Sequence, residues 1–295
     1  MSATQARGNL RGALLMAAAA VLFSVEALFV RWMTARGVPV TTQLAFRAGG
    51  QLLWVTPLLV TGGVALLRSR HVGLHILRGS CSLATWALYY VSLSLLDMAT
   101  ATVLSFTSVM ITTLLAGPVL REKVGMARWG GVLAGFAGVC LMLRPWEGAG
   151  LLSAAPWGVA AALAASVTWC GLTLTTRMLT RSESTATILA WVGTVTFLGI
   201  LPAALWFWQP LGWRELGLLA AFTIFTPGII WLVTEAFRHG EASAVGPFQY
   251  LRLPVVALIG WAIYAEAPDG MAWAGAAVIL AGACIVSAAE ARAGR

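Results

Sequence analysis

Aromatic and hydroxyl-bearing side chains recur at helical spacing inside long apolar runs of this sequence. Trp86, Tyr89 and Tyr90 stand at i, i+3 and i+4, which places them on one face of a helix. Ser105 and Ser108 share a face in the next apolar run. Such faces can bind a ligand that has an apolar ring and a polar end. The alternative is that these side chains pack between membrane helices or lie at the lipid–water interface.

Further residues of the same kind lie in other apolar runs. Trp169 and Thr173 stand at i and i+4, again on one helical face. The other candidates for ligand contact are Ser24, Trp231, Gln249 and Tyr250.

Two charged residues lie deep inside apolar runs, Glu26 in the first and Arg252 in the ninth. A charge at the centre of a bilayer costs at least about 2.5–3.5 kcal/mol. Either residue could bind an oppositely charged group of a ligand or carry a proton, and the alternative is a structural ion pair. Glu235 precedes Arg238 near the predicted end of a helix, where a structural role is favoured.

The sequence offers little for catalysis or metal binding. His71 and His75 have the i, i+4 spacing of a helical metal site, but no third ligand is near. Because Arg68, Arg70 and Arg78 flank them, a solvated basic loop is predicted. The chain contains no phosphate-binding glycine loop with a lysine, no HExxH and no GxSxG, and its four cysteines stand singly. We therefore expect no enzymatic activity, no metal, no cofactor and no ATP hydrolysis.

Composition indicates what kind of elements must position these residues. Of the 295 residues, 59% are hydrophobic and 10% are charged, and the mean hydropathy is +0.84. Soluble domains average about 25% charged residues, so an integral membrane protein is predicted. The net charge of +8 comes from basic residues in short loops without interleaved aromatics, which argues against nucleic acid as a partner.

A bilayer-spanning helix needs about 20 apolar residues, and on that length the sequence predicts an all-α membrane protein with ten transmembrane helices. Most of the 19 Lys and Arg residues fall in alternate loops on one side, which predicts that this side and both termini are cytoplasmic. The expected spans are 11–35, 41–67, 73–95, 98–120, 127–145, 155–180, 185–208, 213–238, 243–264 and 270–290.

A motif occurs twice, as LREKVGMARWGGVLAGFAGV at 120–139 and YAEAPDGMAWAGAAVILAGA at 264–283. Each copy has a carboxylate in a loop and then a glycine-lined helix, which we expect to pack tightly on its neighbours. Shifting the sequence by 144 positions aligns the two copies, with Glu122 on Glu266, Trp129 on Trp273, Gly131 on Gly275 and Gly138 on Gly282. A shift of 146 positions aligns the first apolar run with the sixth, with Gly12 on Gly158 and Arg31 on Arg177.

These matches predict two five-helix repeats, 1–146 and 147–295, around a central cavity. Because five is odd, the second repeat must be inverted relative to the first, an arrangement typical of secondary transporters. The alternative is chance similarity within low-complexity apolar sequence.

On these residues the sequence resembles the drug/metabolite transporter superfamily and, within it, the EamA family. Over the whole chain it looks most like the YddG-type exporters of aromatic amino acids in the bacterial inner membrane. The resemblance implies that spans 1, 3, 4, 6, 8 and 9 surround a central cavity. The residues that would then contact substrate are Ser24, Glu26, Trp86, Tyr89, Tyr90, Ser105, Ser108, Trp169, Thr173, Trp231, Gln249, Tyr250 and Arg252.

The resemblance also implies a function, which is export of aromatic and other apolar amino acids by alternating access. The alternative is efflux of cationic drugs or of other small metabolites. The expected partners are these small molecules and the lipid bilayer, and a monomer would suffice.

Two dipeptides, Pro227-Gly228 and Gly246-Pro247, could interrupt spans 8 and 9. The residues expected to act in hinges or close packing are Pro118, Gly138, Pro227, Gly228, Gly246, Pro247, Pro254 and Gly282.

Overall fold

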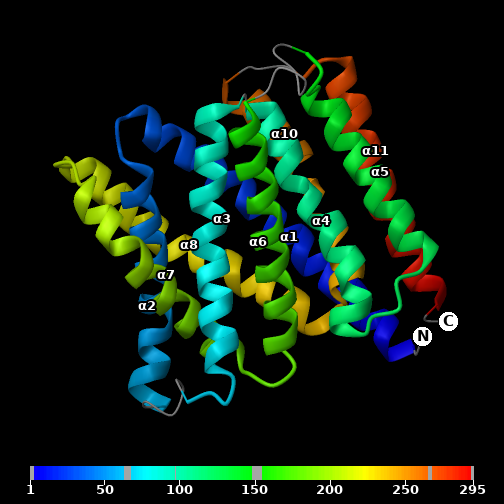
Figure 1. Cartoon of the computed structure of the whole chain (residues 1–295), viewed down its shortest axis with the longest axis horizontal. Coiled ribbons are helices and arrows are strands. Elements are labelled where there is room, and N and C mark those ends of the chain that lie inside the picture. Colours follow the sequence, from blue (N-terminus) through cyan, green and yellow to red (C-terminus); the bar gives the residue numbers. More distant parts are fainter. Residues whose placement is uncertain (1–2, 63–67, 97, 148–154, 265–267, 294–295) are drawn as a thin grey trace.

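The computed structural model describes residues 3–62, 68–96, 98–147, 155–264 and 268–293, and the regular elements in these ranges are all helical (Figure 1). Glu266 of the second motif lies outside the described residues. The first five helices are α1 (Ala3–Ala35), α2 (Val40–Gly62), α3 (Val72–Leu95), α4 (Met98–Leu120) and α5 (Met126–Leu143). They are followed by α6 (Pro156–Leu179), α7 (Thr185–Trp206), α8 (Trp213–His239), α9 (Ala242–Val245), the 3-10 helix η3 (Gly246–Leu251), α10 (Arg252–Tyr264) and α11 (Gly270–Ala293).

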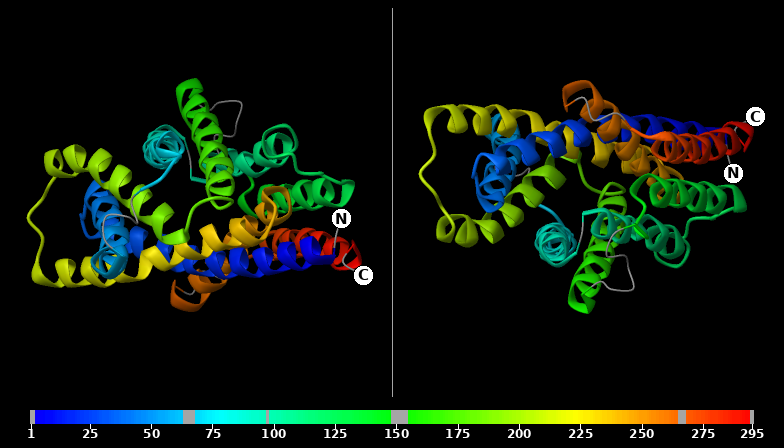
Figure 2. Two further views of the ribbon diagram at one scale, coloured as in Figure 1. Left: turned by 90° about the horizontal axis from the view of Figure 1, so that it is seen from below. Right: turned by 90° about the horizontal axis from the view of Figure 1, so that it is seen from above.

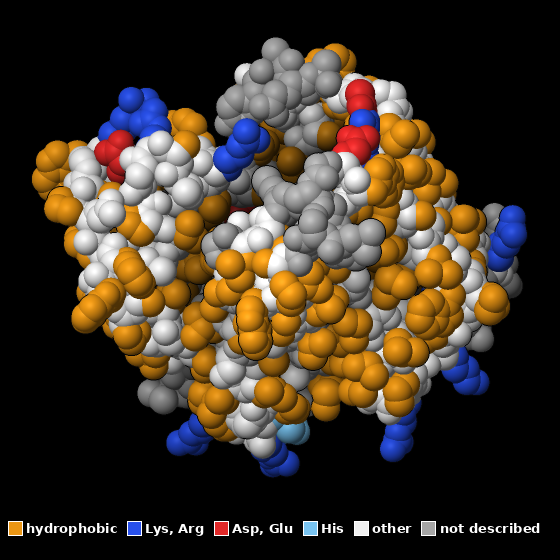
Figure 3. Space-filling view, turned by 45° about the horizontal axis from the view of Figure 1, so that its top comes forward, with side chains coloured by type: hydrophobic (Ala, Val, Ile, Leu, Met, Phe, Trp, Pro, Cys, Tyr) orange, Lys and Arg blue, Asp and Glu red, His pale blue; other side chains and the backbone are white. Residues whose placement is uncertain are grey.

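Eight helical segments in the described residues are long and apolar enough to cross a membrane. Hydrophobic side chains cover the flank of the molecule, and Lys and Arg side chains gather towards its ends (Figure 3). The helices α2 and α3 are of similar length but are not among the eight. They carry polar side chains that are buried inside the protein, including Arg47 and Gln51 on α2 and His75 and Arg78 on α3. The predicted all-α membrane class agrees with these findings.

Helices from the two halves of the chain pack against each other. The main pairs are α5 with α11, α3 with α6, α2 with α7 and α1 with α8, and Figure 2 shows α1 and α8 side by side. The N- and C-termini lie close together at one end of the molecule (Figures 1 and 2). We call this end the terminal face and the opposite end the far face.

The repeated glycines bring α5 and α11 into direct backbone contact. A Cβ atom on Gly138 would lie 2.6 Å from the carbonyl oxygen of Gly275, and a Cβ on Gly275 would lie 2.6 Å from that of Gly138. Gly131 and Gly282 form a second reciprocal pair, at 3.0 and 2.9 Å. The predicted tight packing of these helices is confirmed, and the two motifs pack on each other.

Replacing Gly138 with leucine is therefore expected to destabilise the protein. A Cβ at this position would lie within 3.0 Å of the Gly275 carbonyl oxygen, the Ile279 backbone nitrogen and the Ile279 side chain, and the two backbone atoms can move only with their helix. Such overpacking costs at least about 1–3 kcal/mol. The midpoint of thermal unfolding in detergent measures the effect. Gly130→Leu is the matched control, since a Cβ at Gly130 on the same helix meets nothing within 4 Å. Equal midpoints for the two variants would contradict this account of the contact.

The ninth span is interrupted as expected, because α9 ends at Val245 and a 3-10 helix begins at Gly246-Pro247. The expected interruption of the eighth span is wrong, since α8 runs unbroken through Pro227 and Gly228. Membrane helices tolerate such a proline where neighbouring groups bond the freed backbone. Pro118 likewise lies inside a continuous helix, α4, and Pro254 lies in the first turn of α10.

Candidate functional site

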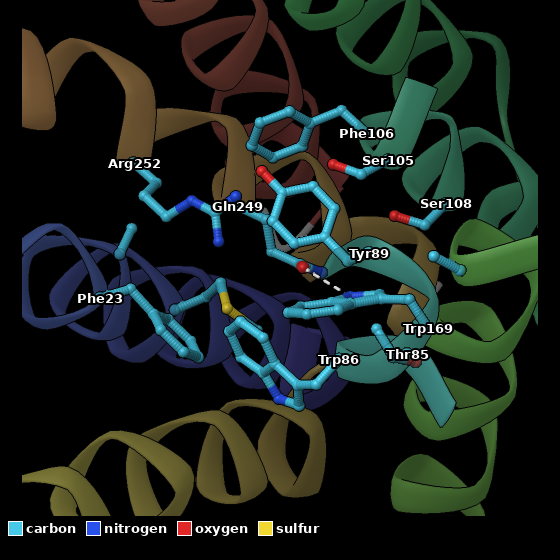
Figure 4. A pocket seen from close by; sticks show the side chains of 13 residues that line it. Phe23, Thr85, Trp86, Tyr89, Ser105, Phe106, Ser108, Trp169, Gln249 and Arg252 are labelled. Carbon is cyan, nitrogen blue, oxygen red and sulfur yellow. Dashed lines mark hydrogen bonds between the residues drawn. The ribbon is translucent and has the colours of Figure 1, made fainter. Parts of the chain in front are cut away.

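A pocket inside the bundle collects side chains from six helical segments (Figure 4). We call it the central pocket, and its empty space, counted together with the solvent at its mouth, is about 640 Å³. Helices α1, α3, α4 and α6, the 3-10 helix η3 and the start of α10 supply its lining. The lining residues are Met16, Ala20, Phe23, Thr85, Trp86, Tyr89, Ser105, Phe106, Ser108, Ala165, Trp169, Gln249 and Arg252.

Hydrogen bonds hold two of the rings in this pocket. The indole nitrogen of Trp169 donates to Oε1 of Gln249 at 3.1 Å, the contact drawn as a dashed line in Figure 4. The hydroxyl groups of Tyr89 and Thr102 are 3.1 Å apart. These bonds hold the polar ends of the two rings in place beside the pocket.

Arg252 is the charged side chain among the described lining residues. Its guanidinium lies 4.9 Å from the ring centroid of Phe106, and no carboxylate of the described chain is within 4.0 Å of it. The backbone at the break in the ninth span is bonded, because the Arg252 N–H donates to the carbonyls of Gln249 and Tyr250. The site thus offers a ligand a guanidinium rather than free backbone N–H groups at residue 252.

A second cavity adjoins the central pocket and shares five lining residues with it, Met16, Phe23, Trp86, Trp169 and Gln249. We call this cavity the lower chamber, and its empty space, counted together with the adjoining solvent, is about 580 Å³. It lies towards the terminal face, because Thr173 lines it one helical turn beyond Trp169 on α6. The lining residues are Met16, Phe23, Arg47, Gln51, Arg78, Ser82, Trp86, Trp169, Leu172, Thr173, Val192, Ile230, Val233, Phe237 and Gln249.

Glu26 is engaged in a buried ion pair beside these cavities. Its Oε1 accepts a hydrogen bond from Nε of Arg47 at 2.6 Å, and both side chains are less than 10% exposed. The Arg47 guanidinium also lies 5.4 Å from the ring of Trp86. Glu26 lines neither cavity, so its expected role as a substrate ligand gives way to a structural ion pair.

Glu122, the carboxylate of the first motif, is buried at the terminal face. It accepts hydrogen bonds from the backbone N–H groups of Ala242 (2.8 Å) and Ser243 (3.0 Å) and from the Ser243 hydroxyl (2.8 Å). Nε of Arg177 is 3.6 Å from Glu122 Oε1. A carboxylate is stabilised at the N-terminus of a helix by the unpaired N–H groups there, so Glu122 fixes the start of the interrupted ninth span.

A second buried group extends this network. Arg128 donates to Glu290 at 2.9 Å and to the Ser243 hydroxyl at 2.8 Å, and it pairs with Glu241. Asn9 joins the termini to it by donating to Glu290 at 2.6 Å and accepting from the Glu241 N–H at 2.9 Å. We call these residues and Glu122 and Arg177 the terminal-face network. Arg177 is one turn beyond Thr173 on α6, so the network lies between the lower chamber and the terminal face.

The structure brings together most of the candidate residues. Trp86, Tyr89, Ser105, Ser108, Trp169, Gln249 and Arg252 line the central pocket, and Thr173 lines the lower chamber.

The other candidates are elsewhere. The Ser24 hydroxyl is buried and donates to the Arg252 carbonyl at 3.0 Å, and Tyr250 is buried against Phe106 and Gly135. Tyr90 lines a separate pocket near the far face that extends to Trp206. Trp231 is substantially exposed on α8 and lines none of these cavities. These four residues therefore do not line the central pocket.

Several lining residues were not candidates on sequence. Phe23, Phe106 and Thr85 line the central pocket. A Phe side chain has no polar atom, so nothing distinguishes a pocket Phe from the other hydrophobic residues of an apolar run. His75 and Arg78 were expected in a solvated loop, but both are buried within α3, and the His75 ring stacks on Trp191 with centroids 5.4 Å apart. Helices α6 and α7 cover this end of α3.

Known proteins are similar to this chain in sequence and in fold. The model of the EamA-like transporter family matches the chain twice, over residues 10–144 and 156–288. A riboflavin transporter of Vibrio cholerae serotype O1 is 30% identical, covering 97% of this chain and 96% of that protein. An S-adenosylmethionine uptake transporter of Rickettsia prowazekii is 27% identical over 76% of this chain and 74% of that protein. A solved crystal structure with 23% identity has the same fold, at a TM-score of 0.78 over 95% of this chain and 98% of that one.

The family matches together span most of the chain, so the family predicted from the repeated motif is confirmed. Neither of these two relatives is named for amino acid export. The chain is a multi-pass membrane protein that belongs to the EamA-like transporter family.

Proposed function

We propose that this protein is a secondary transporter of a planar heteroaromatic compound without a positive charge, with riboflavin as the compound to test first. The observation that carries the proposal is the lining of the central pocket. Aromatic rings (Phe23, Trp86, Tyr89, Phe106 and Trp169) provide stacking surfaces, and Gln249, Arg252 and serine hydroxyls provide hydrogen bonds. Such a lining suits a flat ring system with polar atoms along its edges. The name of the Vibrio cholerae relative points to the same class of compound.

A second candidate is export of aromatic amino acids. One observation favours it, since Arg252 beside Phe106 could bind a carboxylate next to an aromatic ring. The described lining of the central pocket contains no acidic residue that could pair with the ammonium group, and Glu26 is bound to Arg47. A zwitterion would therefore leave one charge unpaired, and a cationic drug would meet Arg252. Both bring a positive charge that no carboxylate in the described lining can pair with, so both are disfavoured relative to a ring without a positive charge.

Transport by alternating access between two inverted repeats, 1–146 and 147–295, is part of the proposal. Contacts exchange as such a symmetry requires, because α3 with α6 corresponds to α8 with α1, while α2 with α7 and α5 with α11 map onto themselves. The two separate family matches support the same division.

We further propose that the protein lies in the bacterial inner membrane as a monomer with both termini cytoplasmic. Substrate would then move along its gradient without a cofactor.

Riboflavin binding to the purified protein tests this function. Riboflavin fluorescence should be quenched on titration, because its ring would stack on indole and phenol rings. Trp169→Ala should weaken binding at least about tenfold, which corresponds to 1.4 kcal/mol. Trp157→Ala is the matched control, since Trp157 lies on the same helix and is 82% exposed. The proposal fails if the protein does not quench riboflavin fluorescence or if both variants bind riboflavin equally. A change in protein fluorescence on adding free tyrosine, without any riboflavin binding, would favour the amino acid candidate.

A further inference from the structure

Arg78 presents a buried positive charge to the lower chamber. Its side chain lines the cavity although the residue is only 2% exposed. Nε donates to the Thr176 hydroxyl at 2.7 Å, but Nη1 has no hydrogen-bond partner. No carboxylate of the described chain lies within 4.0 Å of the guanidinium. The charge is thus only partly compensated by the protein itself.

Other buried arginines nearby are compensated. Arg47 is paired with Glu26 at 2.6 Å, and Arg128 contacts both Glu241 and Glu290. A buried charge without a partner is costly, and such groups are normally paired or hydrogen-bonded. Because Arg78 departs from this rule at the edge of a cavity, a ligand that supplies the missing negative charge would be stabilised there.

A second donor in the same cavity is also unused. The Thr173 side-chain oxygen is buried and has no hydrogen-bond partner. Thr173 is one turn before Thr176 on α6, so its hydroxyl lies on the same helix face that holds Arg78. A planar guanidinium and a hydroxyl together match the oxygens of a phosphate or carboxylate group.

We infer that the lower chamber is a binding site for an oxyanion, a phosphate or carboxylate group, with Arg78 as its main ligand and Thr173 as a second donor. The oxyanion is either a free ion or the anionic tail of a ligand whose ring occupies the central pocket. The second source rests on the proposed function, and the two cavities are adjacent because five residues, Trp86 and Trp169 among them, line both.

Inorganic phosphate tests the site independently of any flavin. Its apparent affinity is measured from the rise in the thermal unfolding midpoint of the full-length protein, at constant ionic strength set with chloride. Arg78→Gln should weaken phosphate binding at least tenfold and Thr173→Val severalfold, while Arg78→Lys should keep part of it. Arg70→Gln is the control, because Arg70 is exposed near the same end of the molecule. Phosphate affinity that is absent, or equal in Arg78→Gln and Arg70→Gln, would overturn the inference. If Arg78→Gln does not fold, equal affinity in Thr173→Val, Arg78→Lys and the unaltered protein overturns it.

Two flavins distinguish the sources of the oxyanion. If the chamber holds an anionic tail, flavin 5′-phosphate should bind at least fivefold more tightly than riboflavin, and Arg78→Gln should abolish this preference while Arg70→Gln keeps it. Phosphate binding with no flavin preference supports a free ion at the site. Phosphate binding without any flavin binding supports the chamber site while the proposed flavin function fails, so the two failures are separable.

Discussion

Replacing Glu122 with alanine is expected to open the terminal face to the lower chamber. The substitution removes the acceptor of two backbone N–H groups and the Ser243 hydroxyl, and it leaves Arg177 without its carboxylate. Removing one partner of a buried pair typically costs about 3–5 kcal/mol. Under the proposed alternating access, opening of the terminal face would break these contacts, so their loss should raise the population of an open form at least about a hundredfold.

Cysteine labelling from the terminal face measures this opening. A cysteine introduced at Thr173, in a protein whose four native cysteines are replaced, reports access to the lower chamber. Glu122→Ala should accelerate its reaction with a membrane-impermeant maleimide added at the terminal face. Lys123→Ala is the matched control, since Lys123 is the adjacent residue and is exposed. Labelling that is as slow in Glu122→Ala as in Lys123→Ala would refute a closing role for Glu122.

The second large effect concerns the ion pair between Glu26 and Arg47. Glu26→Leu or Arg47→Met alone leaves an uncompensated charge in an interior where both side chains are less than 10% exposed. Each single substitution should lower the free energy of unfolding by about 3–5 kcal/mol, and the double substitution should cost less than either. If Glu26 acted instead as an independent substrate ligand, the two single effects would be additive.

A surface pair on the same protein provides the comparison for this cycle. Arg36 and Glu215 are 3.6 Å apart, and their side chains are 32% and 23% exposed. Pairs of this kind contribute about 0–1 kcal/mol. Thermal unfolding midpoints of both sets of variants should therefore show strong coupling for Glu26–Arg47 and weak coupling for Arg36–Glu215.

Helical periodicity was sufficient to predict much of the central pocket. Residues three or four apart share a helix face whatever the tertiary structure, so Trp86 and Tyr89 were correctly expected together. The repeated glycines also predicted close helix contact, because a residue without a side chain lets the backbone of another helix approach. The apolar lining residues Phe23 and Phe106 could not be predicted, since the sequence does not show whether an apolar ring in an apolar run faces lipid, a neighbouring helix or a cavity.

Partners that are distant in sequence could not be predicted. Glu122 lies in a loop, as expected. Its hydrogen-bond partners could not be predicted, because they are about 120 positions away, at Ala242 and Ser243. Arg78 was assigned to a solvated loop because its neighbours in sequence are basic, whereas its burial depends on how α6 and α7 cover α3. The motif does not indicate the substrate class, since its repeated glycines form the α5–α11 contact and line neither cavity.

Transport of labelled riboflavin by the purified protein in liposomes tests the central claim most directly. Tryptophan and a cationic dye are run in parallel, each with and without an imposed pH gradient, and Trp169→Ala and Trp157→Ala liposomes serve as the matched pair. We predict riboflavin movement that is saturable, strongly reduced in Trp169→Ala and retained in Trp157→Ala. Movement of tryptophan or of the dye without movement of riboflavin would contradict the proposed substrate class.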